Sequence, residues 1–158
     1  MTEYLPLILL APVLLTVAYF DLRFMRIPDI LTLIVLAVFV VTVAVFPPAD
    51  LWTRVIVAAS VFGLGFIGFA FRLIGGGDVK ILSALMLVVP TSGIVVFANV
   101  FSASMFAGIL LVLAIRQVPQ INSLGWKSFG GSHKFPMGLS IALAGLSFPL
   151  VAMVMQSS

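Results

Sequence analysis

The sequence contains no cysteine and a single histidine among its 158 residues. Without cysteine the chain can form neither a disulfide bond nor a thiolate-ligated metal site. A zinc site uses several histidine, cysteine or carboxylate ligands, so His133 alone does not predict one. The glycine-rich stretches also lack the residues that complete a phosphate-binding or dinucleotide-binding motif. We therefore expect no metal and no other cofactor.

Charge is also scarce. Charged residues make up 8% of the chain and hydrophobic residues 63%, whereas about 25% of a soluble domain is charged. This composition predicts a polytopic membrane protein. No polar stretch is long enough to fold separately, so residues 1–158 are expected to form one domain. The net charge of +3 does not indicate a nucleic-acid partner, because basic residues in a membrane protein report topology first.

Apolar runs of about 20 residues, the length of a transmembrane helix, recur along the chain. The residues before the first run include Glu3 and no basic residue, so they lack the positive start of a signal peptide. The first run is therefore expected to be a retained span. Between the fourth and fifth runs, a turn at residues 90–93 would leave the fourth span short; the alternative is a kink at Pro90 and a turn near Asn99. The runs predict an all-α protein with six spans, at residues 4–20, 30–46, 55–74, two within 79–115, and 136–155.

Six spans would put both termini on the same side of the membrane. Seven of the eight Lys and Arg residues then lie on the opposite side, in its loops or, for Arg72 and Lys80, at the edges of a loop, and only Arg54 does not. The positive-inside rule makes that opposite side cytoplasmic and both termini non-cytoplasmic. Three of the five acidic residues, Asp21, Asp29 and Asp78, also lie at span ends on the cytoplasmic side.

A carboxylate at a membrane edge is costly, which makes Asp21 and Asp78 candidates for a functional site. Three glycines precede Asp78 and remove every side chain from its approach, so that another backbone can come close. They also predict an unwound segment, which at membrane depth must lie beside protein or water. The alternative is a tight turn after which Asp78 only caps the next helix.

Two carboxylates at close range share one proton and titrate as a unit. Such a pair can activate water as a general base and protonate a leaving amine as a general acid, which is the chemistry of aspartic peptidases. Since Asp78 precedes a helix and Asp21 follows one, the helix dipoles favour charge on Asp78 and the proton on Asp21. Two other hypotheses remain: a small ion- or proton-coupled transporter that uses the same aspartates, and a non-catalytic subunit of a secretion machine.

Three short stretches resemble the motifs of the prepilin peptidases, which are membrane aspartic peptidases of the GxGD type. They are Asp21–Arg23 with Ile27–Asp29, then Gly75–Lys80, and finally Phe135–Gly138. The short chain resembles the peptidase-only branch that serves tight-adherence (Flp) pili, and also the archaeal preflagellin peptidases. The larger members N-methylate the new pilin terminus and carry a cysteine-bearing segment; its absence here argues against methyltransferase activity.

The resemblance implies an endopeptidase of the cytoplasmic (inner) membrane that removes the short basic leader from prepilins or pseudopilins at the cytoplasmic face. Besides these substrates, the expected partners are the lipid bilayer and the pilus assembly machinery, and the oligomeric state stays open. Asp29 is expected to cap the second helix, and Lys80 either orients the active loop or anchors it at the interface. The implied catalytic residues are Asp21 and Asp78, with support from Gly75, Gly77, Lys80, Asp29, Pro136 and Gly138.

Overall fold

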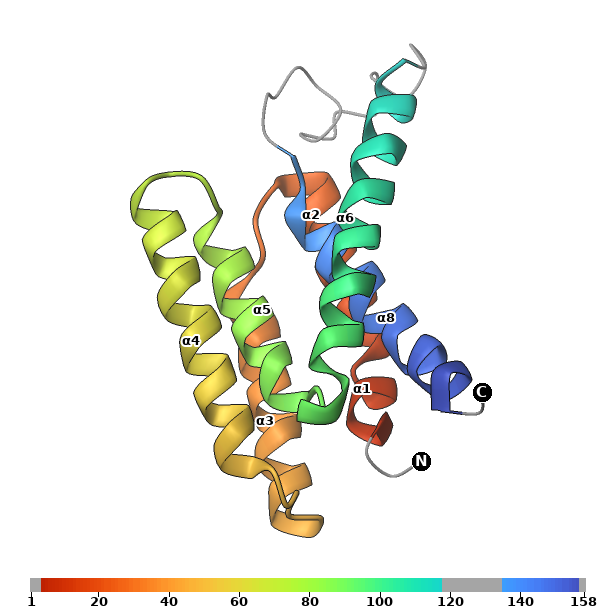
Figure 1. The fold of residues 1–158 in the computed structure, drawn as a ribbon. Helices are drawn as coiled ribbons and strands as arrows, with labels where there is room; N and C mark the ends of the chain where they lie inside the picture. The colour runs from red at the N-terminus through yellow and green to blue at the C-terminus, as the bar shows by residue number, and fades with distance from the viewer. Residues whose placement is uncertain (1–3, 118–134, 157–158) are drawn as a thin grey trace.

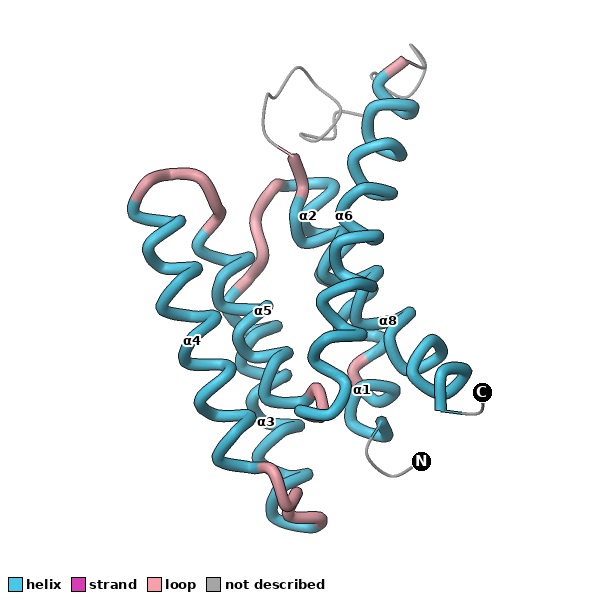
Figure 2. Tube along the Cα trace, in the orientation of Figure 1, coloured by secondary structure: helices cyan, strands magenta, loops and turns pink. Residues whose placement is uncertain are grey.

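The computed structural model describes residues 4–117 and 135–156, and within them it contains helices and connecting loops but no strand (Figures 1 and 2). This confirms the all-α fold class for the described residues. The predicted polar loop with Lys127, His133 and Lys134 lies largely outside them. The helices are α1 (Leu5–Leu9), α2 (Ala11–Phe24), α3 (Asp29–Val45), α4 (Leu51–Ala70), α5 (Gly76–Val88), the 3-10 helix η2 (Thr91–Gly93), α6 (Ile94–Arg116) and α8 (Met137–Gln156).

Three described helical segments are long and apolar enough to cross a membrane, namely Leu51–Ala70, Thr91–Ile115 and Met137–Met155. The shorter helix Asp29–Val45 is apolar as well. The first expected span is instead two helices, α1 and α2, that meet at Leu10. Pro12 follows this junction and has no N–H to continue the helical hydrogen bonds across it. The count of six spans and the orientation of the termini stay predictions.

The turn between the fourth and fifth apolar runs lies at Pro90–Gly93, where η2 leads directly into α6. Val89, which precedes the proline, is extended with ψ 126°, as the steric demand of proline on its neighbour requires. Asn99 lies inside α6, so the alternative turn is wrong. As a result α5 has only 13 residues, the short fourth helix that this turn implied.

The helices form two groups that meet around α5 (Figure 1). In one group α5 packs between α3 and α4, and in the other α8 packs between α2 and α6. Most side chains of α5 are buried although the helix is short. By contrast, α4 and α6 expose large apolar side chains such as Leu64 and Phe106. Patches of this kind are a liability in water, and lipid would cover them in a bilayer.

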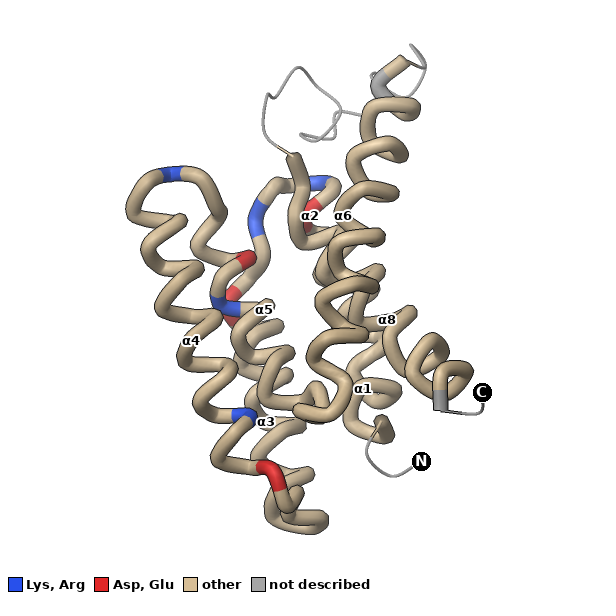
Figure 3. The backbone as a smooth tube through the Cα atoms, viewed as in Figure 1, with Lys and Arg blue, Asp and Glu red and all other residues tan. Residues whose placement is uncertain are grey.

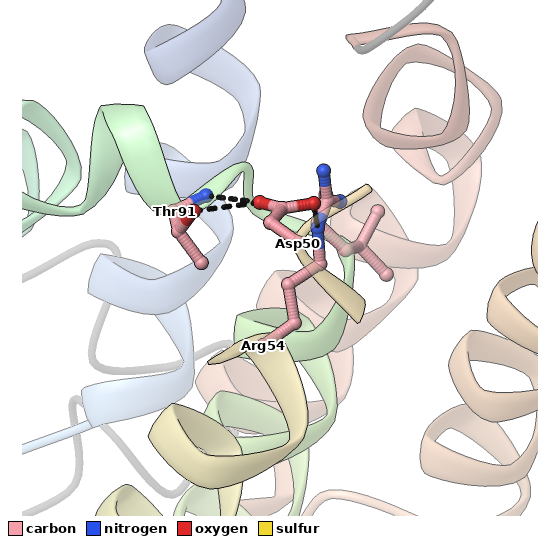
Figure 4. Close-up of polar contacts among 4 residues, drawn as sticks. Asp50, Arg54 and Thr91 are labelled. Atoms are coloured by element: carbon pink, nitrogen blue, oxygen red, sulfur yellow. Dashed lines mark hydrogen bonds and ion pairs between the residues drawn. The ribbon is translucent and has the colours of Figure 1, made fainter. Parts of the chain in front are cut away.

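Figure 3 marks most of the charged positions along the backbone at the end of the molecule that holds the α2–α3 and α4–α5 loops, and a smaller group at the opposite end of α5. The smaller group is a polar clamp formed by Asp50, Arg54 and Thr91 (Figure 4). Asp50 Oδ1 pairs with Arg54 Nε at 2.8 Å, and Asp50 Oδ2 accepts both the N–H and the hydroxyl of Thr91. Arg54 is buried and also donates to the carbonyl of Val88, the last residue of α5. The clamp therefore ties the start of α4 to the end of α5.

Asp50→Asn is expected to lower the midpoint of thermal unfolding in detergent at neutral pH. Hydrogen bonds to a charged group contribute about 1.5–3 kcal/mol and neutral ones about 0.5–1.5 kcal/mol, so the loss is about 1 kcal/mol. For a chain of this size that corresponds to about 2–4 °C. Asp29→Asn is the matched control, because the Asp29 side chain is 69% exposed and exposed ion pairs contribute little.

The same clamp gives a pH signature. Burial by itself raises the pKa of Asp50, but the hydrogen bonds from Thr91 and Arg54 outweigh burial and bring the pKa from 3.8 to about 2. The pKa of Asp50 is lower in the folded protein than in the unfolded chain. The charged Asp50 therefore stabilises the fold fully at a pH above 3.8, and this stabilisation is lost as the pH falls through about 2. The difference in melting temperature between the wild type and Asp50→Asn should therefore close over this range. A difference that stays constant would contradict the clamp.

Candidate active site

Asp21 lies in the last turn of α2, and its side chain is buried with 4% of its surface exposed. The helix ends three residues later, and Met25 closes it in the left-handed conformation with φ 52°. The N–H of Met25 donates to the carbonyl of Asp21 at 2.9 Å. The chain then turns back toward α3, so that Asp21 and the α2–α3 loop share one end of the molecule.

The N-terminus of α8 holds the Asp21 carboxylate. The N–H of Leu139 donates to Asp21 Oδ2 at 3.2 Å, and the N–H of Gly138 also donates to this carboxylate. Free N–H groups at a helix start, together with the helix dipole, stabilise negative charge. Gly138 makes this approach possible, because a Cβ at this position would lie 2.8 Å from Asp21 Oδ2.

Asp78 lies in the first turn of α5, two residues after its first residue, Gly76. The prediction of an unwound glycine segment was wrong in part, since Gly76 and Gly77 form helix and only Gly75 is extended. The Asp78 carboxylate accepts the N–H of Gly75, as the acidic member of a capping box does. Asp78 Oδ1 is buried and has no hydrogen-bond partner among the described residues.

The two aspartates are brought together from different helices. They are close enough that the charge of Asp21 bears on the ionisation of Asp78. Both line two cavities, which also share Met25 and Gly75. The loop cavity, of about 690 Å³, is bounded by the α2–α3 loop and includes Asp29. The helix cavity, of about 520 Å³, is bounded by the ends of α4 and α8 and by the middle of α6.

The other predicted residues lie around this pair in different ways. Asp29 begins α3, as predicted, but its carboxylate makes no capping bond and pairs with Lys80 Nζ at 2.8 Å. This ion pair ties the start of α3 to α5. Gly77 packs on Ile27 of the α2–α3 loop, where a Cβ would lie 3.1 Å from the Ile27 Cβ. Pro136 is buried directly before α8 and lines neither cavity.

Sequence reasoning missed two parts of the site. The first is the backbone of Leu139, whose N–H gives no signal in a sequence. The second is Met105, which brings α6 into the helix cavity from the middle of an apolar run. Within residues 4–117 and 135–156, no cluster of three or more side chains suited to a metal ion occurs. His133 lies outside these residues.

A model of the type IV leader peptidase family matches residues 8–113 of the chain. The chain belongs to this family. The matched region includes Asp21, Asp29 and the Gly75–Lys80 segment, while α8 with Gly138 lies beyond it. No curated protein matches the chain, and no solved structure matches it either. This membership confirms the resemblance to the prepilin peptidases and indicates that the chain is a peptidase, and the family suggests prepilin-type substrates.

The Asp29–Lys80 ion pair is expected to have a modest effect on turnover. Both side chains are largely exposed, and such pairs contribute about 0–1 kcal/mol. Asp29→Asn should therefore keep most of the rate of leader removal, and Asp29→Lys should lose more because it faces Lys80 with a like charge. The charge-swapped double variant, Asp29→Lys with Lys80→Asp, should recover part of that loss. If the double variant is no better than Asp29→Lys alone, the pair does not contribute through its charges.

Proposed function

We propose that the protein is a membrane-embedded aspartic endopeptidase that removes the basic leader from type IV prepilins or pseudopilins at the cytoplasmic membrane face. One observation carries the proposal: the buried carboxylate of Asp21 and the half-buried carboxylate of Asp78, from separate helices, line the same two cavities, and Asp78 Oδ1 is buried with no hydrogen-bond partner among the described residues. An unpaired polar atom in a buried site is costly. A substrate carbonyl or the attacking water would pair with it.

The contacts favour a particular division of roles. Asp21 accepts two N–H groups at the start of α8, which stabilise its charged form. Asp78 accepts the single N–H of Gly75, and its Oδ1 is left for a proton or a substrate atom. The resting enzyme would then hold the charge on Asp21 and the proton on Asp78. This reverses the expectation from the sequence, which did not include the N-terminus of α8.

The reaction balances with these two groups and one water. Asp21 takes a proton from the water while the water oxygen bonds to the scissile carbonyl carbon. At the same time Asp78 gives its proton to the carbonyl oxygen. Asp78 then takes a proton from one hydroxyl of the resulting gem-diol, while Asp21 gives its proton to the nitrogen. The C–N bond breaks into a carboxylic acid and an amine, and both aspartates return to their starting states. The alternative of an ion- or proton-coupled transporter has no support in the family match.

The proposal is tested with the purified protein and a prepilin bearing its leader, with the product identified by a gel shift and by the mass of its new N-terminus. Cleavage is expected to persist when EDTA is present, because the acid–base work needs only two carboxylates and water. Cleavage that EDTA abolishes and zinc restores would contradict the aspartic mechanism. The absence of cleavage for prepilins of every class tried would contradict the proposed activity.

A further inference from the structure

The two cavities share the aspartate pair and otherwise have different walls. Apart from the residues that both cavities share, the loop cavity is bounded by Phe20 and Phe24 of α2, by Arg26–Asp29 and by the first turn of α5. The helix cavity is bounded by Phe69 at the end of α4, Met105 of α6 and Met137 of α8. A peptide whose scissile bond lies at Asp21 and Asp78 can therefore reach both cavities, with the segment before the bond in one and the segment after it in the other.

The helix cavity reaches an apolar, membrane-spanning part of the chain. Met105 lies well inside Thr91–Ile115, one of the segments long and apolar enough to cross a membrane. Phe69 belongs to another such segment, and its ring lies over Gly76, where a Cβ would be 3.2 Å away. The loop cavity instead borders the short connection between α2 and α3, with the charged residues Arg26 in that connection and Asp29 at the start of α3.

The charges of the two cavities differ as well. Apart from the aspartate pair, the loop cavity has one arginine and one aspartate, Arg26 and Asp29. The helix cavity has Arg72 and no acidic residue besides the pair. A basic peptide segment would therefore meet a balanced charge in the loop cavity and net positive charge in the helix cavity. Both cavities have phenylalanine side chains, but only the helix cavity adds the methionines Met105 and Met137 for an apolar segment.

We propose that the substrate binds in one direction: the leader occupies the loop cavity, and the apolar segment after the scissile bond occupies the helix cavity between α4, α6 and α8. This assignment rests on the proposed function, since it takes its substrate to be a basic leader followed by an apolar helix. The apolar side chains of Phe69, Met105 and Met137 in the helix cavity suit such a helix. Met105 and Phe69 then act as specificity-determining residues for the mature part of the substrate.

Cysteine cross-linking can test this direction, because the chain has no cysteine of its own. Met105→Cys and Arg26→Cys are placed separately in an Asp78→Asn background, which keeps the bound prepilin uncleaved. Each is combined with a prepilin that carries one cysteine a few residues before or after the scissile bond. Disulfide formation with copper phenanthroline as the oxidant is then read on a non-reducing gel. Phe106→Cys is the matched control, since the adjacent Phe106 is 66% exposed and lines neither cavity.

Met105→Cys is expected to give a shifted band only with the cysteine after the bond, and Arg26→Cys only with the cysteine before it. Phe106→Cys should give neither. The opposite pattern, or no band from Met105→Cys with a prepilin that the wild type cleaves, would overturn the assignment while leaving the proposed function intact. If the wild type fails to cleave the prepilin, the proposed function fails, and the assignment fails with it. Size-exclusion profiles identify any variant that does not fold.

Discussion

Asp21→Asn and Asp78→Asn are each expected to stop leader removal. General acid–base catalysis contributes about 10²- to 10⁴-fold to a rate, and each carboxylate takes part in both steps of the proposed cycle. Asparagine has nearly the same size as aspartate and keeps a carbonyl oxygen. It can therefore still accept the N–H of Leu139 at position 21 or that of Gly75 at position 78, so the fold should persist. The loss should appear in kcat and not in expression.

The double variant distinguishes a shared mechanism from two separate contributions. Members of one catalytic unit are not additive, so Asp21→Asn combined with Asp78→Asn should be little worse than either alone. The measurement is leader removal from a prepilin under single-turnover conditions, with melting temperatures to confirm folding. Full cleavage by Asp78→Asn would exclude the aspartic mechanism. Loss of cleavage in Asp29→Asn with activity retained in Asp21→Asn would show that Asp78 has a different partner.

Local chemistry accounts for the parts of the fold that could be predicted. Pro28 and Asp29 indicated the start of α3, and the chain enters that helix at Asp29. The proline and glycine at residues 90–93 indicated the turn before α6, where η2 lies. In both cases proline restricts the backbone within its own neighbourhood, so no distant contact is needed to set the boundary.

Long-range packing accounts for the parts that could not be predicted. The N–H of Leu139 reaches Asp21 across 118 positions of the chain, and no local pattern records which helix end faces which carboxylate. Without this contact, the dipoles of α2 and α5 alone placed the charge on Asp78. The sequence also did not show that Arg54 is buried, with Asp50 and the carbonyl of Val88 accepting from its guanidinium.

Gly138→Ala is expected to lower the rate of leader removal by about a hundredfold, the size of effect that a displacement of about 1 Å can have on catalysis. The added methyl carbon would lie 2.8 Å from Oδ2 and 2.9 Å from Cγ of Asp21, and 2.9 Å from Cδ1 of Ile27. These distances are too short, and a buried two-carbon side chain cannot move away as the end of a long one can. Asp21 would leave its position opposite Asp78, or α8 would retreat and withdraw its N–H groups.

The matched control is Gly63→Ala, at a glycine in the middle of α4 where an added Cβ would meet nothing within 4 Å. Alanine in place of a mid-helix glycine stabilises by about 0.5–1 kcal/mol, so this variant should keep its activity and melt slightly higher.

Gly75→Ala adds a second site: its Cβ would lie 2.5 Å from Asp78 Oδ2, and its backbone is extended, a conformation that alanine also adopts. Both active-site variants should thus lose turnover through a displaced carboxylate while the helices remain folded. Wild-type turnover in Gly138→Ala would mean that Asp21 does not need the start of α8 to work.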